Sequence, residues 1–461
     1  MDNGCYSRRS MLALACALPL RGQSSRVFDV RDYGAVGDGK VLDTAAIQRA
    51  IDAAAAAGGG ARVLIRGGKK YLAGTLTLKS GIDFHLADDA ELLASTNPAH
   101  YPAGADGVIV ANGARDLKIS GTGNIDGRAL EFMTRFSKEG EIWEFGPFRP
   151  KIFVLTACQG LEVRDISFGN APFWGLHMLG CEHVLVDHVK VRNLLDVPNC
   201  DGIDPDHCRD VEIRNCDIVC GDDAIVVKTT RQAVNYGPSA NITVKDCVIE
   251  TKDSGLKIGT ETTQDVHDIR FERCEIRSGC RAMTIQLRDE GSVYGIDFTD
   301  IKFLIRYQAA PWWGRAEAIS FTAIPRAKGG QVGQIRDVRI RNATGRAENS
   351  VRIDGVAESR IRNVSLENVA ITFDRWTAYP GGAYDNRPTS AYPGLEPHQT
   401  PGIHIRHADH VTLKDCKVAW GANRPDYFTH ALEAEHTSDL GISGFTGEAA
   451  HPARDPAILI R

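Results

Sequence analysis

Short stretches of alternating apolar and polar residues recur from about residue 75 onward, and each ends at Gly, Asn or Asp. The first apolar residues of successive stretches are Leu117, Leu161, Val184, Val211, Ile242, Ile269, Ile296, Val338, Val364, Val411 and Leu440. Most intervals are near 27 residues, as between Val184 and Val211, with no helical period between them. A parallel β-helix produces this pattern, because each coil stacks on the next. We therefore predict an all-β fold, a single right-handed parallel β-helix (solenoid).

The segment from Thr44 to Ala57 departs from this pattern. It consists mostly of residues with good helix propensity and ends at Gly58, Gly59 and Gly60. We predict an amphipathic N-terminal capping helix, because the open end of a solenoid would otherwise expose a sheet edge. Residues 25–461 are thus expected to form one β-helix domain.

An export signal is predicted at residues 1–24. Arg8 and Arg9 precede a short apolar run that ends near Leu20. A membrane span needs about 20 apolar residues, so a membrane anchor is not expected. The arginine pair matches a twin-arginine signal, which a receptor reads as an address. The alternative is a chance Arg-Arg in an irregular N-terminus. We expect export to the periplasm or the extracellular space.

Composition indicates an ordinary folded protein and argues against nucleic-acid binding. Of the 461 residues, 43% are hydrophobic, and 54 basic against 59 acidic residues give a formal charge of −5. Four of the twelve cysteines, Cys216, Cys247, Cys274 and Cys416, share near-identical contexts. They are expected to be buried thiols stacked at one repeated position, in preference to disulfide or metal-binding cysteines.

Three intervals are longer than one repeat, at roughly residues 128–150, 306–316 and 373–401. Loops of this length in a compact repeat protein are usually functional or disordered, and insertions in solenoids tend to collect on the binding face. The first and last are rich in aromatic residues, and the second contains Trp312 and Trp313. These side chains are expected either to stack on sugar rings or to plug and cap the coils.

Several aspartates are brought together when the coils are aligned. Placing Ile203, Ile225, Leu256 and Met283 at one position of four successive coils makes Asp201 and Asp223 neighbours, with Asp222 beside them and Asp253 one coil further. Neighbouring coils lie about 4.8 Å apart, so these carboxylates crowd together and at least one pKa is raised. Glycoside hydrolysis requires one protonated carboxyl for the leaving oxygen and one ionised carboxylate for water. A carboxyl separation of about 6.5–9.5 Å indicates inversion and one near 5 Å indicates retention.

Three motifs carry a resemblance to a known family. They are FDVRDYGAVGDG at residues 28–39 followed by DTAAIQ at 43–48, NCDGID at 199–204, and GDDAI at 221–225. With them the chain resembles the family 28 glycoside hydrolases, the pectin-degrading polygalacturonase family. The resemblance implies an inverting hydrolase without a cofactor. Asp222 would then be the general acid, while Asp201 and Asp223 would hold and activate water.

The chain departs from typical polygalacturonases at three positions. Ser254 replaces their histidine, and Thr284 and Gln286 replace an Arg and a Lys that grip a uronate in that family. The resemblance therefore implies an α-linked pectic polysaccharide or oligosaccharide with a rhamnogalacturonan-type or other uronate-containing linkage, in preference to plain polygalacturonan. The residues expected to contact this substrate are Asp204, Asp253, Lys257, Lys228, Arg288 and His207. The basic ones could instead simply pair with the carboxylates.

Other interpretations of the acidic centre stay open at this point. Its aspartates could form Asx-type turns with no further role. The set Asp201, Asp204, Asp206, Asp222 and Asp223 could bind calcium, as in a calcium-dependent polysaccharide lyase. The chain could also be a non-catalytic carbohydrate-binding β-helix, since fold alone does not fix function. For the hydrolase we expect a monomer without a metal ion, and no nucleic-acid or membrane partner.

Overall fold

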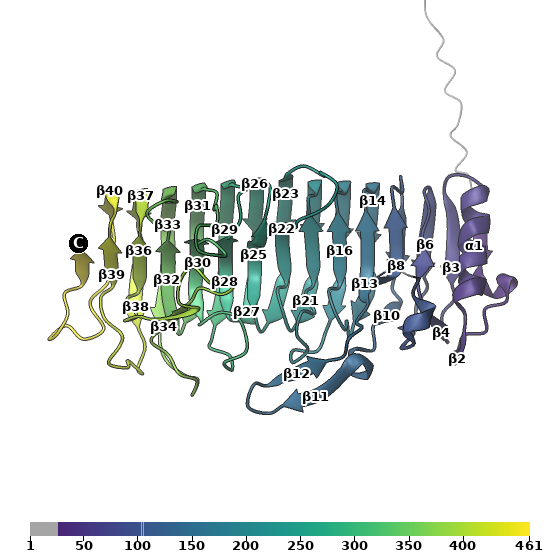
Figure 1. Ribbon diagram of the computed structural model, residues 1–461, viewed down its shortest axis with the longest axis horizontal. Helices are drawn as coiled ribbons and strands as arrows, with labels where there is room; N and C mark the ends of the chain where they lie inside the picture. The colour runs from purple at the N-terminus through teal and green to yellow at the C-terminus, as the bar shows by residue number, and fades with distance from the viewer. Residues whose placement is uncertain (1–25, 103, 105) are drawn as a thin grey trace, which may run out of the picture.

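Each typical coil of the structure consists of three short strands joined by tight turns. One coil contains β19 (Ile203–Asp206), β20 (Arg209–Arg214) and β21 (Asp217–Cys220), and the next coil pairs with it in parallel. The computed structural model describes residues 26–102, 104 and 106–461, so the predicted export signal at residues 1–24 lies outside the described residues. The predicted right-handed parallel β-helix with an N-terminal helix is confirmed (Figure 1).

Stacking of the coils produces three parallel sheets in the described part of the chain. The first contains β1 (Val27–Asp29), β3 (Ala61–Ile65), β6 (Ile82–Leu86), β9 (Lys118–Gly121), β14 (Gln159–Arg164), β17 (Glu182–Asp187), β20, β23 (Ser239–Lys245), β26 (Val266–Glu272), β29 (Val293–Ile305), β31 (Ile335–Ala347), β33 (Ile361–Phe373), β37 (Ala408–Lys414) and β40 (Ser438–Ser443). The second contains β2 (Asp38–Leu42), β4 (Lys69–Ala73), β7 (Ala90–Ala94), β10 (Asn124–Asp126), β15 (Ser167–Gly169), β18 (Lys190–Arg192), β21, β24 (Val248–Thr251), β27 (Glu275–Gly279) and β38 (Lys417–Trp420), and it shares the long strands β29, β31 and β33 with the first.

The third sheet carries the candidate site on its outer face. It contains β5 (Leu76–Thr77), β8 (Gly107–Asn112), β13 (Lys151–Thr156), β16 (Leu176–Leu179), β19, β22 (Ile225–Thr229), β25 (Ser254–Thr262), β28 (Arg281–Leu287), β30 (Glu317–Ala323), β32 (Asn349–Asp354), β36 (Ile403–Arg406), β39 (Leu432–Glu435) and β41 (Ile458–Ile460). Along β19, β22 and β25, apolar side chains point into the coils, so the polar side chains between them face outward.

The register of the coils agrees with the sequence pattern. From Leu161 to Leu440, each predicted anchor is the register partner of the next one. The alignment that assembled the acidic centre is also confirmed, because Ile203 pairs with Ile225, Ile225 with Leu256, and Leu256 with Met283.

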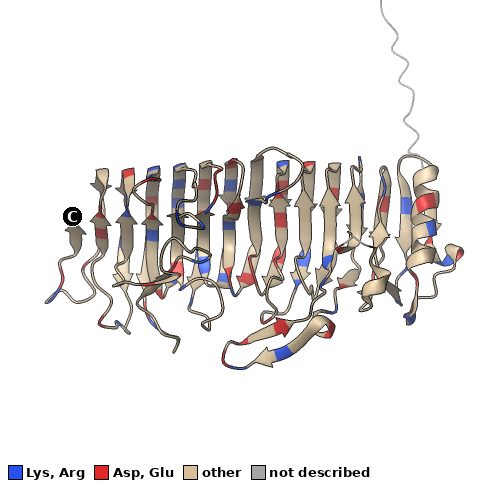
Figure 2. Ribbon diagram, in the orientation of Figure 1, with Lys and Arg blue, Asp and Glu red and all other residues tan. Residues whose placement is uncertain are grey.

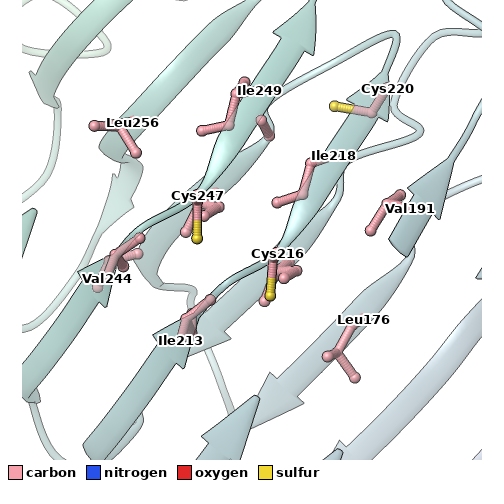
Figure 3. Packing of buried hydrophobic residues seen from close by; sticks show 14 of the residues in the cluster. Leu176, Val191, Ile213, Cys216, Ile218, Cys220, Val244, Cys247, Ile249 and Leu256 are labelled. Atoms are coloured by element: carbon pink, nitrogen blue, oxygen red, sulfur yellow. The ribbon is translucent and has the colours of Figure 1, made fainter. Parts of the chain in front are cut away.

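The inside of the coils is filled by stacked apolar side chains. Cys216 and Cys247 occupy equivalent places in successive coils, beside Ile218 and Ile249 (Figure 3). The ten cysteines in the described residues are all buried and none forms a disulfide. This confirms the predicted thiol stack, in which cysteine packs as a small apolar side chain.

Helix α1 (Thr44–Ala56) covers the N-terminal end of the coils, as predicted (Figure 1). It buries Ala46, Ile47, Ala50, Ile51 and Ala54. The strand stack begins earlier than residue 75, because β1 already pairs with β3. The sequence pattern misses these first strands since the helix lies between them. Short 3-10 helices occur at η1 (Val30–Tyr33), η2 (Pro98–His100) and η3 (Ala129–Phe132).

The three long insertions contact one another. The first contains the hairpin β11 (Met133–Ser137) and β12 (Ile142–Phe145), and the third contains the hairpin β34 (Ala383–Asp385) and β35 (Leu395–Pro397). Glu141 joins them, because it accepts hydrogen bonds from Tyr379 Oη and, through its backbone oxygen, from Trp312 Nε1 at 3.3 Å. The insertions therefore collect on one side of the β-helix, as solenoid insertions often do.

Charged residues are mixed on the surface. In the view of Figure 2, basic and acidic residues alternate along the coils and the β11–β12 hairpin. This agrees with the nearly balanced composition and gives no basic face on this side of the molecule. Among the described residues, no helix combines the length and apolar character that a membrane crossing needs.

Candidate active site

Three aspartates occupy equivalent turns of two adjacent coils. Asp201 lies just before β19, and Asp222 and Asp223 lie just before β22. The turns stack directly, since Gly202 N donates to Asp223 O at 2.9 Å. Carboxylate oxygens of the three aspartates lie within 4.8 Å of one another. The structure therefore brings together the acidic centre that the sequence predicts.

These aspartates lie at the base of a pocket of about 200 Å³. Asp222 is 6% exposed, and Asp201 and Asp223 are exposed still less. The pocket is lined by Trp174, Asn199, Asp201, Asp222, Asp223, Lys228, Asp253, Lys257, Gly259, Thr260, Glu261, Gln286, Trp313, Arg387 and Pro388. Carboxyl groups that are nearly buried and still reach a pocket are candidates for acid–base chemistry.

Asp222 is held in a fixed orientation and retains a proton near neutral pH. Burial raises the pKa of Asp222 to about 7, and the charges of Asp201 and Asp223 act in the same direction. Its Oδ2 accepts from Asn199 N at 3.0 Å and its Oδ1 from Asp223 N at 2.9 Å. A carboxyl with this pKa can give up a proton and regain it in neutral solution.

The insertion at 128–150 positions Asn199, the donor to Asp222. Arg149 Nη2 donates to Asn199 Oδ1 at 3.1 Å, and Arg149 Nη1 donates to Pro198 O at 3.0 Å. The guanidinium lies 3.5 Å from the centre of the Phe145 ring. Asn199 has φ +57°, in the left-handed region where asparagine is enriched. The insertion is thus linked to the candidate acid through one residue.

Lys228 lies between Asp201 and Asp204. Its Nζ is 3.0 Å from Asp201 Oδ2, 2.9 Å from Asp204 Oδ1 and 3.8 Å from the centre of the Trp174 ring. Burial opposes the charge of Lys228, but the two carboxylates outweigh this effect and raise its pKa, so it remains an ammonium ion. Burial raises the pKa of Asp201, and Lys228 opposes that rise.

Lys257 makes the equivalent contact one coil further. Its Nζ donates to Asp223 Oδ2 at 2.7 Å, and both side chains are almost fully buried. Asp223 and Asp253 raise the pKa of Lys257 against the opposing effect of burial. The other oxygens, Asp201 Oδ1 and Asp223 Oδ1, accept no hydrogen bond from any residue that the structure describes. Both oxygens are buried, and buried acceptors without a protein partner are usually satisfied by water or a ligand.

Asp253 lies behind this group and is fully buried. Its Oδ1 accepts from Ser254 Oγ at 3.0 Å. Burial raises the pKa of Asp253 well above the usual carboxyl value, and Asp223 adds to the rise. Asp253 is therefore a buried carboxyl with a raised pKa that lines the pocket.

A family model for the glycosyl hydrolases family 28 matches residues 61–380 of the chain. The chain belongs to this family. A second model, described as rhamnogalacturonase A/epimerase, pectate lyase-like, matches residues 27–85 of the family 28 chain. The resemblance drawn from the sequence motifs is thereby confirmed.

Several plant proteins are similar to this chain in sequence. A "Probable polygalacturonase" of Vitis vinifera is 28% identical over 292 residues, which cover 58% of this chain and 58% of the relative. A "Polygalacturonase" of Chamaecyparis obtusa is 28% identical, with 60% of this chain and 54% of the relative covered. The chain thus spans less than two thirds of the length of these relatives.

Solved structures confirm the fold. The Yersinia enterocolitica family 28 exopolygalacturonase has a TM-score of 0.70 at 20% identity, with 91% of this chain and 78% of that chain covered. A hyperthermoactive exopolygalacturonase from Thermotoga maritima has a TM-score of 0.68 at 19% identity, with 86% and 92% covered.

Two residues predicted to contact substrate do not line the pocket of this family 28 chain. Asp204 is fully buried beneath Lys228. His207 is 1% exposed, and its ring nitrogens contact the backbone oxygens of Gly237 at 2.5 Å and Thr230 at 2.8 Å. The prediction for His207 is wrong, because the loop after β22 folds over this turn and covers the ring.

Arg288, which was also predicted to contact the substrate, lies outside the pocket lining. It directly follows β28 and is 1% exposed. Its Nη1 donates to Ile324 O at 3.1 Å, so the segment after β30 covers it. Burial lowers the pKa of Arg288 to about 9, and the charges of Arg352 and Arg281 add to this effect. Strand alternation correctly predicts an outward side chain but not the segment that covers it.

Lys228, Lys257 and Asp253 line the pocket, and their contact with a substrate stays a prediction. Both lysines are ion-paired with aspartates, which is the alternative role considered for them. They supply two positive charges to the group of three aspartates. A calcium site needs oxygen ligands around a cation. Two ammonium groups in that position make the arrangement a poor fit for calcium.

Sequence reasoning missed two pocket residues, Trp174 and Arg387. Trp174 follows β15 in a short turn, and Arg387 belongs to the insertion at 373–401. Gln286 Nε2 donates to Arg387 O at 3.4 Å, so Arg387 lies next to one of the positions where the family's basic pair is missing. In the sequence, the unusual length of this insertion was the feature that could have pointed to Arg387. Of the two tryptophans, Trp312 is a buried plug, whereas Trp313 is 37% exposed and lines the pocket.

Proposed function

We propose that this protein hydrolyses an α-linked pectic glycan at the pocket formed by Asp201, Asp222 and Asp223. The observation that carries the proposal is a protonated carboxyl, Asp222, with a pKa of about 7, held beside two further carboxylates in a pocket. Family membership supports the same chemistry, and the names of the relatives point to pectic substrates.

In the proposed reaction, Asp222 gives its proton to the glycosidic oxygen as the bond to the anomeric carbon breaks. A water molecule held by Asp201 Oδ1 and Asp223 Oδ1 attacks that carbon and loses a proton to the ionised carboxylate. Lys257 holds the Asp223 carboxylate in place through the 2.7 Å contact. The two free oxygens and the fixed acid supply every proton transfer that hydrolysis requires.

The stereochemical course is proposed to be inversion, as the family resemblance implies. The oxygens of the three aspartates lie within 4.8 Å, which is closer than the separation of about 6.5–9.5 Å usual for an inverting pair and is near the 5 Å that indicates retention. Inversion therefore rests on the family resemblance and not on this spacing. One water bound to two carboxylates places their oxygens at most about 5.4 Å apart, because each contact is about 2.7 Å. The close spacing fits two aspartates that share the attacking water. The anomer formed first, followed by proton NMR, decides this point, and a retained anomer would reject inversion.

The substrate is proposed to carry a uronate next to the cleaved bond. Arg387 and Lys257 line the pocket, and Arg387 lies beside Gln286, where the usual basic pair is absent. The absence of that pair favours a rhamnogalacturonan-type linkage. Arg387 Nε and Nη2 already donate to Asp385, at 2.9 Å and 2.7 Å, so its remaining Nη1 group is the one proposed to bind the carboxylate. The exposed ring of Trp313 is placed to stack on a sugar.

A panel of pectic oligosaccharides tests the proposal. Rhamnogalacturonan and homogalacturonan fragments are incubated with the full chain, and reducing ends are measured with the product anomers. Hydrolysis of at least one fragment, lost in Asp222→Asn, is the expected result. An unsaturated, ultraviolet-absorbing product that disappears with a chelator would instead indicate a lyase. Binding without turnover by both proteins would indicate a carbohydrate-binding module.

Export of the protein is proposed on the basis of residues 1–24. Replacing Arg8 and Arg9 by lysine is expected to stop export through a twin-arginine pathway, and fractionation of a bacterial host with an antibody against the chain measures it. Unchanged export of this variant would reject the twin-arginine signal.

A further inference from the structure

A second group of possible ligands lies away from the acidic centre, at the C-terminal end of the third sheet. His404 is on β36, Glu435 ends β39 in the next coil, and His398 follows β35 in the insertion at 373–401. One atom from each, the ring nitrogens and a carboxylate oxygen, lie within 4.8 Å of one another. The insertion thus meets two coils at these three side chains.

The two ring nitrogens of His404 lack hydrogen-bond partners among the described residues. His404 is fully buried. The nearest carboxylate oxygen, Glu433 Oε2, is 3.8 Å from Nδ1, which is too long for a hydrogen bond. A buried polar group without a partner is destabilising, so such a group points to a ligand.

His398 is oriented toward His404. Their ring centres are 4.5 Å apart with the planes at 70°. His398 Nδ1 contacts the backbone oxygen of Gln399, which can only accept, and this contact favours the tautomer with a hydrogen on Nδ1 and a lone pair on Nε2. A histidine that binds a metal through one nitrogen usually donates its other N–H to a carbonyl or carboxylate. For His404, the carboxylate on the side of Nδ1 is Glu433, at 3.8 Å.

We propose that His398, His404 and Glu435 bind a divalent transition-metal ion, with Zn²⁺ as the first candidate. Two imidazoles and one carboxylate form a common zinc ligand set, with water in the fourth position. Bonds of about 2.0–2.1 Å in a tetrahedral site place the ligand atoms about 3.4 Å apart. Glu435 and His398 are only partly buried and can close this distance, whereas His404 is fixed in the sheet. The ion would fasten the insertion that carries Arg387 to the coils beneath it.

Metal titration of the full chain tests the inference, and it does not depend on the proposed hydrolase activity. The protein is stripped with a chelator and titrated with Co²⁺, whose tetrahedral sites absorb visible light. We expect one such ion, displaced by Zn²⁺, and binding weakened at least about 100-fold in the double variant His398→Gln/Glu435→Gln. Zn²⁺ should also raise the unfolding temperature of the wild type but not of this variant. His404 is left unchanged because its replacement could prevent folding.

Two controls make the test specific. His410 and Asp439 form an exposed pair at 3.0 Å on neighbouring coils, so His410→Gln/Asp439→Asn removes the same ligand types elsewhere and should bind Co²⁺ normally. Asp222→Asn should also bind it normally. Absence of a tetrahedral Co²⁺ spectrum, or an unchanged spectrum in His398→Gln/Glu435→Gln, would overturn the inference. Loss of binding in Asp222→Asn would do so as well, because it would assign the ion to the acidic centre.

Discussion

The Nζ atom of Lys257 lies 2.7 Å from Oδ2 of Asp223, an aspartate of the preceding coil, and the two side chains are 7% and 6% exposed. An ammonium this close favours the ionised form of a carboxylate. The positive charge of Lys257 also acts on two further carboxyl groups, Asp222 and Asp253. Asp222 also has its pKa lowered by Lys257, although burial has the larger and opposite effect.

Replacing Lys257 by methionine should impair both stability and catalysis. It leaves Asp223 buried without its partner, which costs about 3–5 kcal/mol unless the group takes up a proton. Because the lysine lowers the pKa of Asp222, its loss should move the alkaline limb of the pH–rate profile above pH 7. Chemical denaturation and rates across pH measure the two effects. Lys245→Met, at a partly exposed ion pair with Glu212, is the matched control. An unshifted alkaline limb would argue against electrostatic control by Lys257.

The variant Asp222→Asn should remove the general acid while keeping the shape of the pocket. General acid catalysis contributes about 10²–10⁴-fold, so the turnover number should fall by that factor on substrates with a poor leaving group. Asp268→Asn, at an exposed pair with His267, is the control and should keep full activity. The measurement is the initial rate of reducing-end release. A loss smaller than tenfold would place the acid elsewhere.

The pH dependence of kcat/KM follows from the pKa of Asp222. Because the acid must be protonated, the rate should fall about tenfold per pH unit above pH 7, where the proton is lost. The alkaline limb of the profile, measured on a single oligosaccharide at low concentration, gives the apparent value for the aspartate group as a whole. A profile that stays flat up to pH 9 would contradict a role for this carboxyl as the acid.

The contribution of Asp222 to stability should depend on pH with the opposite sign to that of an ion-paired aspartate, whose pKa is lowered on folding. The native pKa of Asp222, about 7, lies above its ordinary value of 3.8. The folded state therefore binds more protons between these values, so this group's contribution to stability is largest below pH 4 and is lost as pH rises to 7. In Asp222→Asn the free energy of unfolding should fall less between pH 4 and 7. Equal slopes in denaturation experiments on both proteins would contradict the assignment.

Arg387 should act on substrate affinity more than on turnover. Removing a hydrogen bond to a charged group costs about 1.5–3 kcal/mol, so Arg387→Ala should raise KM about 10–100-fold for a free uronate and little for its methyl ester. Arg387 forms a bidentate pair with Asp385. Arg360→Ala provides the control, because Arg360 forms the same kind of pair with Asp409 outside the pocket. Equal losses on the acid and the ester would reject uronate recognition by Arg387.

The sequence predicted the features that repeat. Asp201, Asp222 and Asp223 could be placed together because the alternation of apolar residues fixes which turns stack, and the register of Ile203, Ile225 and Leu256 confirms it. The thiol stack at Cys216 and Cys247 follows from the same regularity.

The sequence did not predict what covers the outer face of the third sheet. Strand alternation makes Arg288 a polar residue of that face, and His207 directly follows the acidic motif, but other loops bury both of them. Arg387 was missed for the converse reason, since its insertion has no repeat that would give it a position. Contacts between an insertion and a coil depend on tertiary packing. The repeat period of the coils carries no information about that packing.

The hydrogen bonds between successive coils have a consequence for how this scaffold can diverge. Because Gly202 N binds Asp223 O and the turns are stacked backbone on backbone, the pitch of the solenoid determines how far apart the acid and its neighbours sit. Side-chain replacements leave that pitch unchanged. New substrate preferences should therefore arise by lengthening or shortening the turns around the pocket, while the reacting groups stay at a constant separation.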